Sequence, residues 1–316
     1  MKKKHPKALQ YVCRLPGGST PVLIRGDDGK SYVLKFRNNL QGPNVLFNEF
    51  MGTALLEECG LLTPGYAAIR VSEAFLDANP ECWIDGGQQG MIRPNAGLCF
   101  GSRYIGESDG SVLFQLLPEV RFNIIRNREQ FWLAWILDIV AANRDYRQAV
   151  FLSGLKGMLS AVFLDNGHYF GGPDGEPAGV FMKARHPDIR IYPEMNAQEL
   201  LKQRNTIREL DLDALWRKAH ELPDEWKTHS ALRRFARCLD ALEQVALIDS
   251  VQHTIVGHVE RRRRKADEGF RYEDTEESRR ESELYTFLYY SLPSGVRETD
   301  EAAQQRSSVN CPQVRK

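Results

Sequence analysis

Four charged residues and one glycine-containing stretch have the groups that bind phosphate and a divalent cation. Lys35 ends a short apolar run, and Glu49 follows it by 14 residues. Asp145 and Asp165 stand 20 residues apart, each beside other polar residues. Residues 16–20, Pro-Gly-Gly-Ser-Thr, precede all four. A lysine ammonium neutralises phosphate, carboxylates bind Mg²⁺, and glycines let backbone N–H groups approach an anion closely. The pattern therefore indicates a site for a phosphorylated ligand together with a metal ion.

The N-terminal third predicts the sheet and the helix that position the first of these groups. Three strand-like runs are expected to pair as antiparallel neighbours: residues 9–13, 22–24 and 32–36. An Asp-Asp-Gly stretch at 27–29 has the chemistry of a hairpin turn. Residues 45–59 carry apolar side chains at helical spacing and end at Gly60. Residues 66–71 return to extended structure. The lysine is thus expected on a strand and the glutamate on a helix.

The second half is predicted to be mainly helical. Residues 128–142 are apolar on most faces, which is typical of a buried helix. Two short strand-like runs follow. Residues 149–152 come after the loop that contains Asp145, and residues 160–164 come directly before Asp165. Amphipathic helices are expected from 196 to about 264.

These elements predict an α+β chain in three parts. Residues 1–105 form an antiparallel-sheet lobe with the glycine stretch, the lysine and the glutamate. Residues 106–264 form a mainly helical lobe with both aspartate loops. Residues 265–316 are polar and, apart from 284–292, have little to bury, so a disordered tail is expected.

The order of these groups is the order that a protein-kinase-like site needs. The glycine loop admits phosphates, the strand lysine neutralises them, and the helix glutamate holds the lysine. A loop aspartate orients the attacking hydroxyl, and a second aspartate holds Mg²⁺. Phosphoryl transfer depends mostly on positioning and charge neutralisation, so this small set suffices.

Four stretches of the chain resemble the HipA-like kinases of bacteria: TPVLIRGDDGKSYVLKFRNN, NEFMGTALLEECGLLTP, LDIVAANRDYRQAVFL and FLDNGHYF. The resemblance covers roughly residues 8–240 and is closest to short members that lack most of the N-terminal region of the HipA toxin. It implies a two-lobed, protein-kinase-like fold. It also implies binding of Mg²⁺-ATP and transfer of the γ-phosphate to a protein hydroxyl.

The resemblance assigns a role to each matching position. Lys35 would bind the phosphates with Glu49 as its partner, Asp145 would be the catalytic aspartate, and Asp165 would bind the metal. The phosphate loop would be lined by Gly17, Gly18 and Ser19. The segment 98–104 is the candidate link between the lobes, where the backbone would meet the adenine.

One position departs from the kinase pattern. Kinases usually carry a metal-binding Asn five residues after the catalytic Asp, and Val150 stands there. Gln148 is the nearest amide. A loop shorter by two residues would bring Gln148 into the Asn position, where its carbonyl oxygen can bind Mg²⁺. The departure leaves open whether the chain has a second metal ligand and whether it is catalytically active.

Each of these residues also has a plain structural interpretation. The lysine could face solvent from a strand, and the glutamate from a helix. Asp145 could cap a turn, and Asp165-Asn166-Gly167 could be a hairpin turn. Arg103 and His168 are interpreted as structural residues, and the basic run 261–265 as a solvated helix end.

Composition excludes several other classes. The 42 Lys and Arg residues balance 42 Asp and Glu residues, so the whole chain has no electrostatic drive toward nucleic acid or an acidic membrane surface. The longest apolar stretch, 131–142, is too short to span a bilayer. The basic N-terminus has no apolar run behind it, so we expect no signal peptide and a cytoplasmic protein. None of the six cysteines forms a CxxC pair, so a structural zinc site has no support.

The expected partners are ATP, Mg²⁺ and an unidentified hydroxyl-bearing protein. An antitoxin-type partner stays open, and with no helix-turn-helix signature no direct contact with nucleic acid is expected. Two alternatives to a protein kinase also stay open. One is a pseudokinase that binds nucleotide or acts as an interaction module, and the other is a kinase of the same fold acting on a small molecule.

Overall fold

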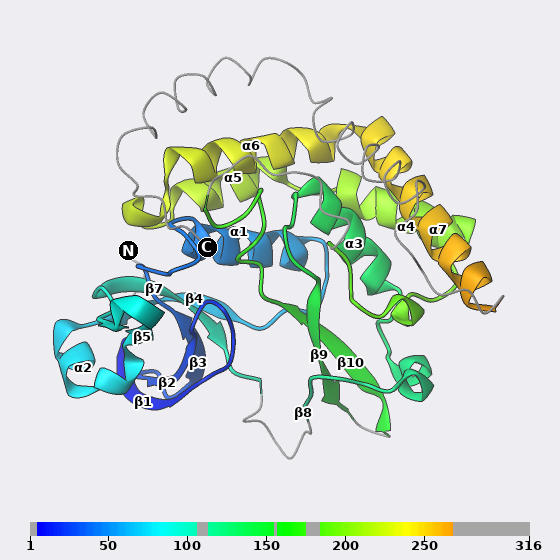
Figure 1. The fold of residues 1–316 in the computed structure, drawn as a ribbon. Helices are drawn as coiled ribbons and strands as arrows, with labels where there is room; N and C mark the ends of the chain where they lie inside the picture. The colour runs from blue at the N-terminus through cyan, green and yellow to red at the C-terminus, as the bar shows by residue number, and fades with distance from the viewer. Residues whose placement is uncertain (1–4, 106–112, 155–156, 175–183, 268–316) are drawn as a thin grey trace.

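The computed structural model describes residues 5–105, 113–154, 157–174 and 184–267. Figure 1 shows an antiparallel sheet on one side and a mainly helical region on the other. Most of the predicted disordered tail, residues 268–316, lies outside the described residues. Residues 265–267 are helical instead, because the last helix continues to Asp267.

The N-terminal sheet has five strands in the order β1-β2-β3-β7-β4. The three strands expected in succession are confirmed, and every neighbouring pair is antiparallel. Gly29 lies in the turn between β2 and β3 with φ 77°, a conformation that glycine adopts without strain. The strands are β1 (Ala8–Arg14), β2 (Val22–Gly26), β3 (Ser31–Lys35), β4 (Tyr66–Val71) and β7 (Gly97–Arg103).

Residues 98–103 of the predicted link belong to β7, an inner strand of the sheet. Strand β7 pairs with β3 on one side and β4 on the other, so its backbone groups are used within the sheet. The N–H of Tyr104 also donates to the carbonyl of Ser31 at 2.9 Å. The chain leaves the sheet only after Tyr104, so a backbone edge for a ligand is not available along most of this segment.

Helix α1 (Val45–Glu58) lies between the sheet and the helical region (Figure 1). Eleven of its 14 residues are buried, because it contacts β4 and β7 on one side and α5 on the other. Gly60, with φ 74°, ends it and donates its N–H to the carbonyl of Glu57. The buried environment explains how a helix can be apolar on all sides and still carry a functional glutamate.

The helical region surrounds α3 (Gln130–Val140), which is buried along nearly its whole length. The hairpin of β9 (Gln148–Ser153) and β10 (Leu159–Leu164) follows α3, with β8 (Leu113–Phe114) at its edge. The remaining helices are α4 (Ala197–Arg208), α5 (Leu212–His220), α6 (His229–Glu243) and α7 (Val245–Asp267).

Several short elements connect these parts: α2 (Glu73–Ala78), β5 (Ile84–Asp85), β6 (Met91–Ile92), η1 (Pro80–Cys82), η2 (Gly87–Gln89), η3 (Glu119–Ile124), η5 (Ile189–Ile191) and η6 (Asp224–Trp226). Within the described ranges, no helix has the length and apolar character needed to cross a membrane. The predicted α+β architecture, an antiparallel N-terminal sheet with a helical C-terminal region, is confirmed.

Candidate functional site

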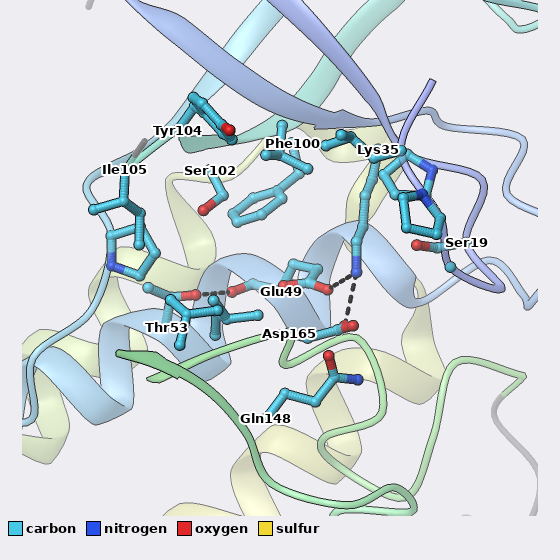
Figure 2. A pocket seen from close by; sticks show the side chains of 18 of the residues that line it. Ser19, Lys35, Glu49, Thr53, Phe100, Ser102, Tyr104, Ile105, Gln148 and Asp165 are labelled. Atoms are coloured by element: carbon cyan, nitrogen blue, oxygen red, sulfur yellow. Dashed lines mark hydrogen bonds and ion pairs between the residues drawn. The ribbon is translucent and has the colours of Figure 1, made fainter. Parts of the chain in front are cut away.

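A cavity of about 270 Å³ lies between the sheet, α1 and the β9–β10 hairpin (Figure 2). The loop between β1 and β2 (residues 15–21), called here the glycine loop, borders it on one side. Its walls include side chains from β3, α1, β7 and the hairpin: Val33, Lys35, Glu49, Thr53, Phe100, Ser102, Gln148, Val150, Leu164 and Asp165. Tyr104 and Ile105, where the chain leaves the sheet, close the opposite side. The cavity is apolar in the middle and charged at one end.

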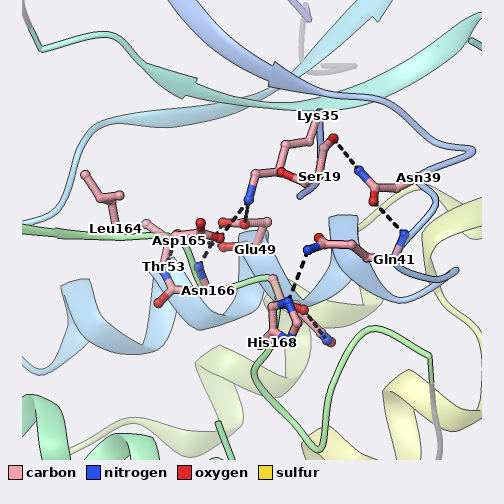
Figure 3. A network of polar contacts seen from close by, with 12 residues as sticks. Ser19, Lys35, Asn39, Gln41, Glu49, Thr53, Leu164, Asp165, Asn166 and His168 are labelled. Atoms are coloured by element: carbon pink, nitrogen blue, oxygen red, sulfur yellow. Dashed lines mark hydrogen bonds and ion pairs between the residues drawn. The ribbon is translucent and has the colours of Figure 1, made fainter. Parts of the chain in front are cut away.

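An ion-pair cluster forms the charged end of the cavity. The ammonium of Lys35, the last residue of β3, donates to Glu49 Oε1 and to Asp165 Oδ1, the latter at 2.8 Å (Figure 3). The side chains of Lys35 and Glu49 are almost fully buried, whereas 30% of the Asp165 side chain is exposed. The structure therefore brings together three residues that the sequence places 14 and 130 positions apart.

Burial and charge act in opposite directions on this cluster. Burial alone would lower the pKa of Lys35, but the carboxylates of Asp165 and Glu49 outweigh it and raise that pKa. Burial would raise the pKa of Asp165, yet the Lys35 ammonium holds it below its usual value. Burial raises the pKa of Glu49 to about 7 despite the opposing charge of Lys35. Above about pH 7 one cation thus faces two carboxylates, and the excess negative charge then suits a divalent metal.

A pH dependence of stability follows from Glu49. A carboxyl whose pKa is higher in the folded state than in the unfolded state binds its proton more tightly when folded. Its contribution to the free energy of unfolding is therefore largest at acid pH and declines as pH rises from about 4.5 to about 7. We expect the parent to lose roughly 1–3 kcal/mol from this group between pH 5 and pH 8. Urea unfolding of the parent and of Glu49→Gln at both pH values measures it, and equal pH slopes would contradict it.

The loop after β10, residues 165–172, is called here the Asp165 loop. Asp165 has φ 61°, a left-handed conformation that is uncommon for a residue with a side chain. The next residue, Asn166, donates its N–H to Glu49 Oε2 at 3.1 Å and its amide to Thr53 Oγ1 at 3.0 Å. Helix α1 thus holds this loop, which does not turn back into a paired strand as the hairpin interpretation would require.

Close packing between α1 and the Asp165 loop requires glycine at position 52. A Cβ there would lie 2.6 Å from Asn166 Cβ and 2.9 Å from Tyr169 Cδ2. Alanine normally stabilises a helix interior by about 1 kcal/mol relative to glycine. Here the clash outweighs that gain, and we expect Gly52→Ala to lower the free energy of unfolding by about 1–3 kcal/mol.

The matched control is Gly257→Ala in α7, where a Cβ would meet only the movable end of Arg261 at 3.2 Å. That variant is expected to be neutral or slightly more stable than the parent. Thermal melts of the two variants decide the matter, since a Gly52→Ala protein that melts above the parent would show that the packing tolerates a methyl group.

The glycine loop places two of its three predicted residues against the cavity. Gly17, with φ 141°, and Ser19 line it, whereas Gly18 does not and instead lies beside the side-chain amide of Gln41. The carbonyl of Ser19 accepts a hydrogen bond from Asn39 at 2.9 Å, which fixes the loop (Figure 3). Two of the three residues predicted to line a phosphate loop thus border the cavity, and their role toward phosphate stays a prediction.

Gln148 reaches the cavity although the kinase pattern expects an amide two positions later. Gln148 and Val150 are two residues apart on β9, so their side chains point to the same face of the strand. Both line the cavity, and Figure 2 shows the Gln148 amide pointing toward Asp165. The strand geometry therefore places the Gln148 amide on the same face of β9 as residue 150, toward the cavity.

Asp145 lies in the loop between α3 and β9, residues 141–147, called here the Asp145 loop. It is half-buried and does not line the cavity. Its Oδ1 accepts the N–H of Tyr146 at 2.7 Å, and its own N–H donates to Asn143 Oδ1 at 3.2 Å. A hydrogen bond from the Arg144 N–H to the His168 carbonyl joins the two aspartate loops at 3.0 Å.

The sequence did not identify Thr53, Asn166 or Arg147 as part of this site. Thr53 looks like an ordinary helix residue, and Asn166 like part of a turn. Arg147 is only 1% exposed, whereas the sequence gives no reason to expect an arginine to be buried. The available signal was position, because Asn166 directly follows Asp165 and Arg147 stands between Asp145 and Gln148.

The donor set fits Mg²⁺ bound together with a nucleotide. In the part of the chain that the structure describes, no three His, Cys, Asp or Glu side chains gather as a metal site. Mg²⁺ usually takes only one or two carboxylates from the protein and its other ligands from phosphates and water. The exposed part of Asp165 and the Gln148 amide, beside an excess negative charge, match that requirement.

No family model and no curated protein matches the chain. Among solved structures, a crystal structure of the Golgi casein kinase with Mn/ADP bound is similar at 13% sequence identity, with a TM-score of 0.43 over 79% of this chain and 72% of that chain. A second structure of the Golgi casein kinase gives 11% identity and a TM-score of 0.42 over 79% and 71%.

The elements of the chain itself define its fold class. A lysine on β3 pairs with a glutamate on α1, and an aspartate after β10 meets both at the edge of an antiparallel sheet. This arrangement of a strand lysine, a helix glutamate and an aspartate after a hairpin is also that of protein kinases. The chain has a protein-kinase-like fold.

Proposed function

We propose that this chain is an ATP-dependent, HipA-like kinase that transfers the γ-phosphate to a serine or threonine hydroxyl of another protein. The observation that carries the proposal is the Lys35 ammonium, held by Glu49 and Asp165 at the charged end of a cavity that the glycine loop borders. A buried lysine held in place by carboxylates, with one of them partly exposed, is arranged to meet phosphates and a metal.

The apolar part of the cavity suits a nucleotide base. Val33, Phe100, Val150 and Leu164 supply apolar walls, and Ser102 adds a hydroxyl. The phosphates would extend toward Lys35, Gly17 and Ser19. Asp165 and Gln148 would hold Mg²⁺, which would neutralise charge on the transferred phosphate.

Asp145 would act on the acceptor rather than on the nucleotide. Because it lies outside the cavity wall, an acceptor hydroxyl would approach it from the protein surface. In the transfer, the hydroxyl oxygen forms a bond to the γ-phosphorus while the bond from that phosphorus to the β,γ-bridging oxygen breaks. The hydroxyl proton passes to the Asp145 carboxylate, and ADP leaves with the bridging oxygen.

A pseudokinase is the second candidate, and one observation favours it. Val150 occupies the position of the usual metal-binding Asn, and Gln148 reaches the cavity on a longer side chain that is less firmly held. A kinase that acts on a small hydroxylated molecule remains a variant of the main proposal, because the cavity does not define the acceptor.

The test is a thermal-shift titration with ATP, with and without Mg²⁺, followed by an assay with γ-labelled ATP. A Mg²⁺-dependent shift with label transferred to a lysate protein or to the chain itself supports the kinase. A shift without transfer to any acceptor favours the pseudokinase. If ATP does not shift the melting temperature at all, both the kinase and the nucleotide-binding pseudokinase are wrong. An interaction module is then the better explanation.

A further inference from the structure

Arg147 uses its complete set of hydrogen-bond donors inside the protein. Its Nε donates to Asp138 Oδ2 at 3.0 Å, and its Nη2 to Asp138 Oδ1 and to the Tyr169 hydroxyl, the latter at 2.7 Å. Its Nη1 donates to the Leu164 carbonyl at 3.3 Å and to Asn166 Oδ1 at 2.9 Å. A guanidinium has five N–H groups, and each has a partner here.

The partners of Arg147 lie on both sides of Asp165. Leu164 precedes Asp165 and Asn166 follows it, while Arg147 itself belongs to the Asp145 loop and directly precedes Gln148. One buried side chain therefore holds the Asp145 loop against the two residues that flank Asp165. Asp138, on α3, neutralises the guanidinium and fixes its plane with two hydrogen bonds.

The same contacts continue to the helix that carries Glu49. Asn166 accepts from Arg147 and donates to Thr53 Oγ1, and the Thr53 hydroxyl donates to the Glu49 carbonyl at 2.6 Å. All of these groups are at most 4% exposed. Packing alone does not require this series of hydrogen bonds, because apolar residues of similar volume often replace a buried ion pair without loss of stability.

We propose that Arg147 is a positioning residue, which sets the spacing between the Asp145 loop and Asp165 and so the spacing of the metal ligands Asp165 and Gln148. The inference rests on the proposed function. Residues that orient metal ligands without touching the metal typically change metal affinity by about 10- to 100-fold when they are substituted. Lysine cannot replace this arginine, because it has three donors on a single nitrogen and no planar fork.

The experiment measures the Mg²⁺ concentration that gives half of the maximal gain in binding of a fluorescent ATP analogue. In Arg147→Lys we expect this concentration to rise about tenfold or more, while affinity for the analogue without metal changes less than about twofold. The control is Arg204→Lys on α4, whose arginine forms a partly exposed ion pair with Asp249 and does not line the cavity. It should keep the Mg²⁺ requirement of the parent.

A second variant keeps the test valid if Arg147→Lys does not fold. Asp138→Leu with Arg147→Met replaces the ion pair by apolar volume and should fold, yet it should show the same raised Mg²⁺ requirement. A requirement equal to that of the parent in a folded variant overturns the positioning role and leaves the kinase proposal intact. A parent that shows no Mg²⁺-dependent binding overturns the proposed function itself, and the positioning role with it.

Discussion

Lys35→Ala is expected to weaken ATP binding by roughly 10- to 150-fold. A hydrogen bond between a charged donor and a charged acceptor contributes about 1.5–3 kcal/mol, and the substitution removes the cation that would meet the phosphates. It also leaves Glu49 and Asp165 facing the nucleotide with no positive charge between them. Isothermal titration with ATP measures the loss directly.

The same substitution changes stability, which the sequence alone did not indicate. The sequence predicts a phosphate-binding lysine with Glu49 as its partner, whereas the structure buries it between two carboxylates, Glu49 and Asp165. Removing one partner of a buried ion pair can cost about 3–5 kcal/mol, and the partial exposure of Asp165 places this case toward the lower end. Lys35→Met keeps the aliphatic volume and should show the same loss of affinity with a smaller loss from packing.

The stability of the Lys35 variants should also depend on pH differently from that of the parent. Without the ammonium, burial and mutual repulsion raise the pKa values of both carboxyls, so the folded state binds protons more tightly and stability falls as pH rises. In the parent, the depressed pKa of Asp165 contributes stability that is present above its unfolded pKa and lost as pH falls below it. The exposed Lys30→Ala should match the parent in affinity and stability. Parent-like ATP binding by Lys35→Met would remove Lys35 from the phosphate site.

The sequence predicted the elements better than the contacts between them. The strands around Lys35, the helix around Glu49 and the buried helix α3 have local patterns, because periodicity and turn residues act over a few positions. The order of the sheet is not local. Strand β7 inserts between β3 and β4 although neither is its neighbour in sequence, and this placement makes residues 98–103 part of an inner strand instead of a link.

The buried polar contacts were the least predictable part of the site. The partners of Asn166 on α1 are more than a hundred residues away in sequence, and no periodicity relates such positions. Arg147 appears from its type as a surface residue, but Asp138 on α3 compensates its charge and allows it to be buried. The charged residues at 35, 49 and 165 were predicted because a strand lysine, a helix glutamate and a loop aspartate follow one another in the order of a protein-kinase-like site.

Asp145→Asn and Asp165→Asn are expected to fail in different ways, and this pair of variants separates an enzyme from a pseudoenzyme. Asp145 would take a proton from the acceptor hydroxyl, so it matters mainly in the transition state. Its substitution should lower phosphate transfer by about 10²- to 10⁴-fold and leave Mg²⁺-ATP affinity within about twofold of the parent. Asp165 would bind the metal already in the ground state, so its substitution should weaken the Mg²⁺-dependent part of nucleotide binding.

The two measurements are γ-phosphate transfer and Mg²⁺-dependent ATP binding, made on the same preparations, with the exposed Asp213→Asn as a control for loss of charge. Asp165→Asn also removes one of the two charges that compensate Lys35, so its binding should be measured well below its melting temperature. If both variants lose metal-dependent affinity alike, Asp145 acts on the nucleotide side and its acceptor role is wrong. If Asp145→Asn transfers phosphate as well as the parent, the base lies elsewhere. The position of Asp145 outside the cavity wall predicts the opposite, a variant that binds Mg²⁺-ATP like the parent and transfers almost none of it.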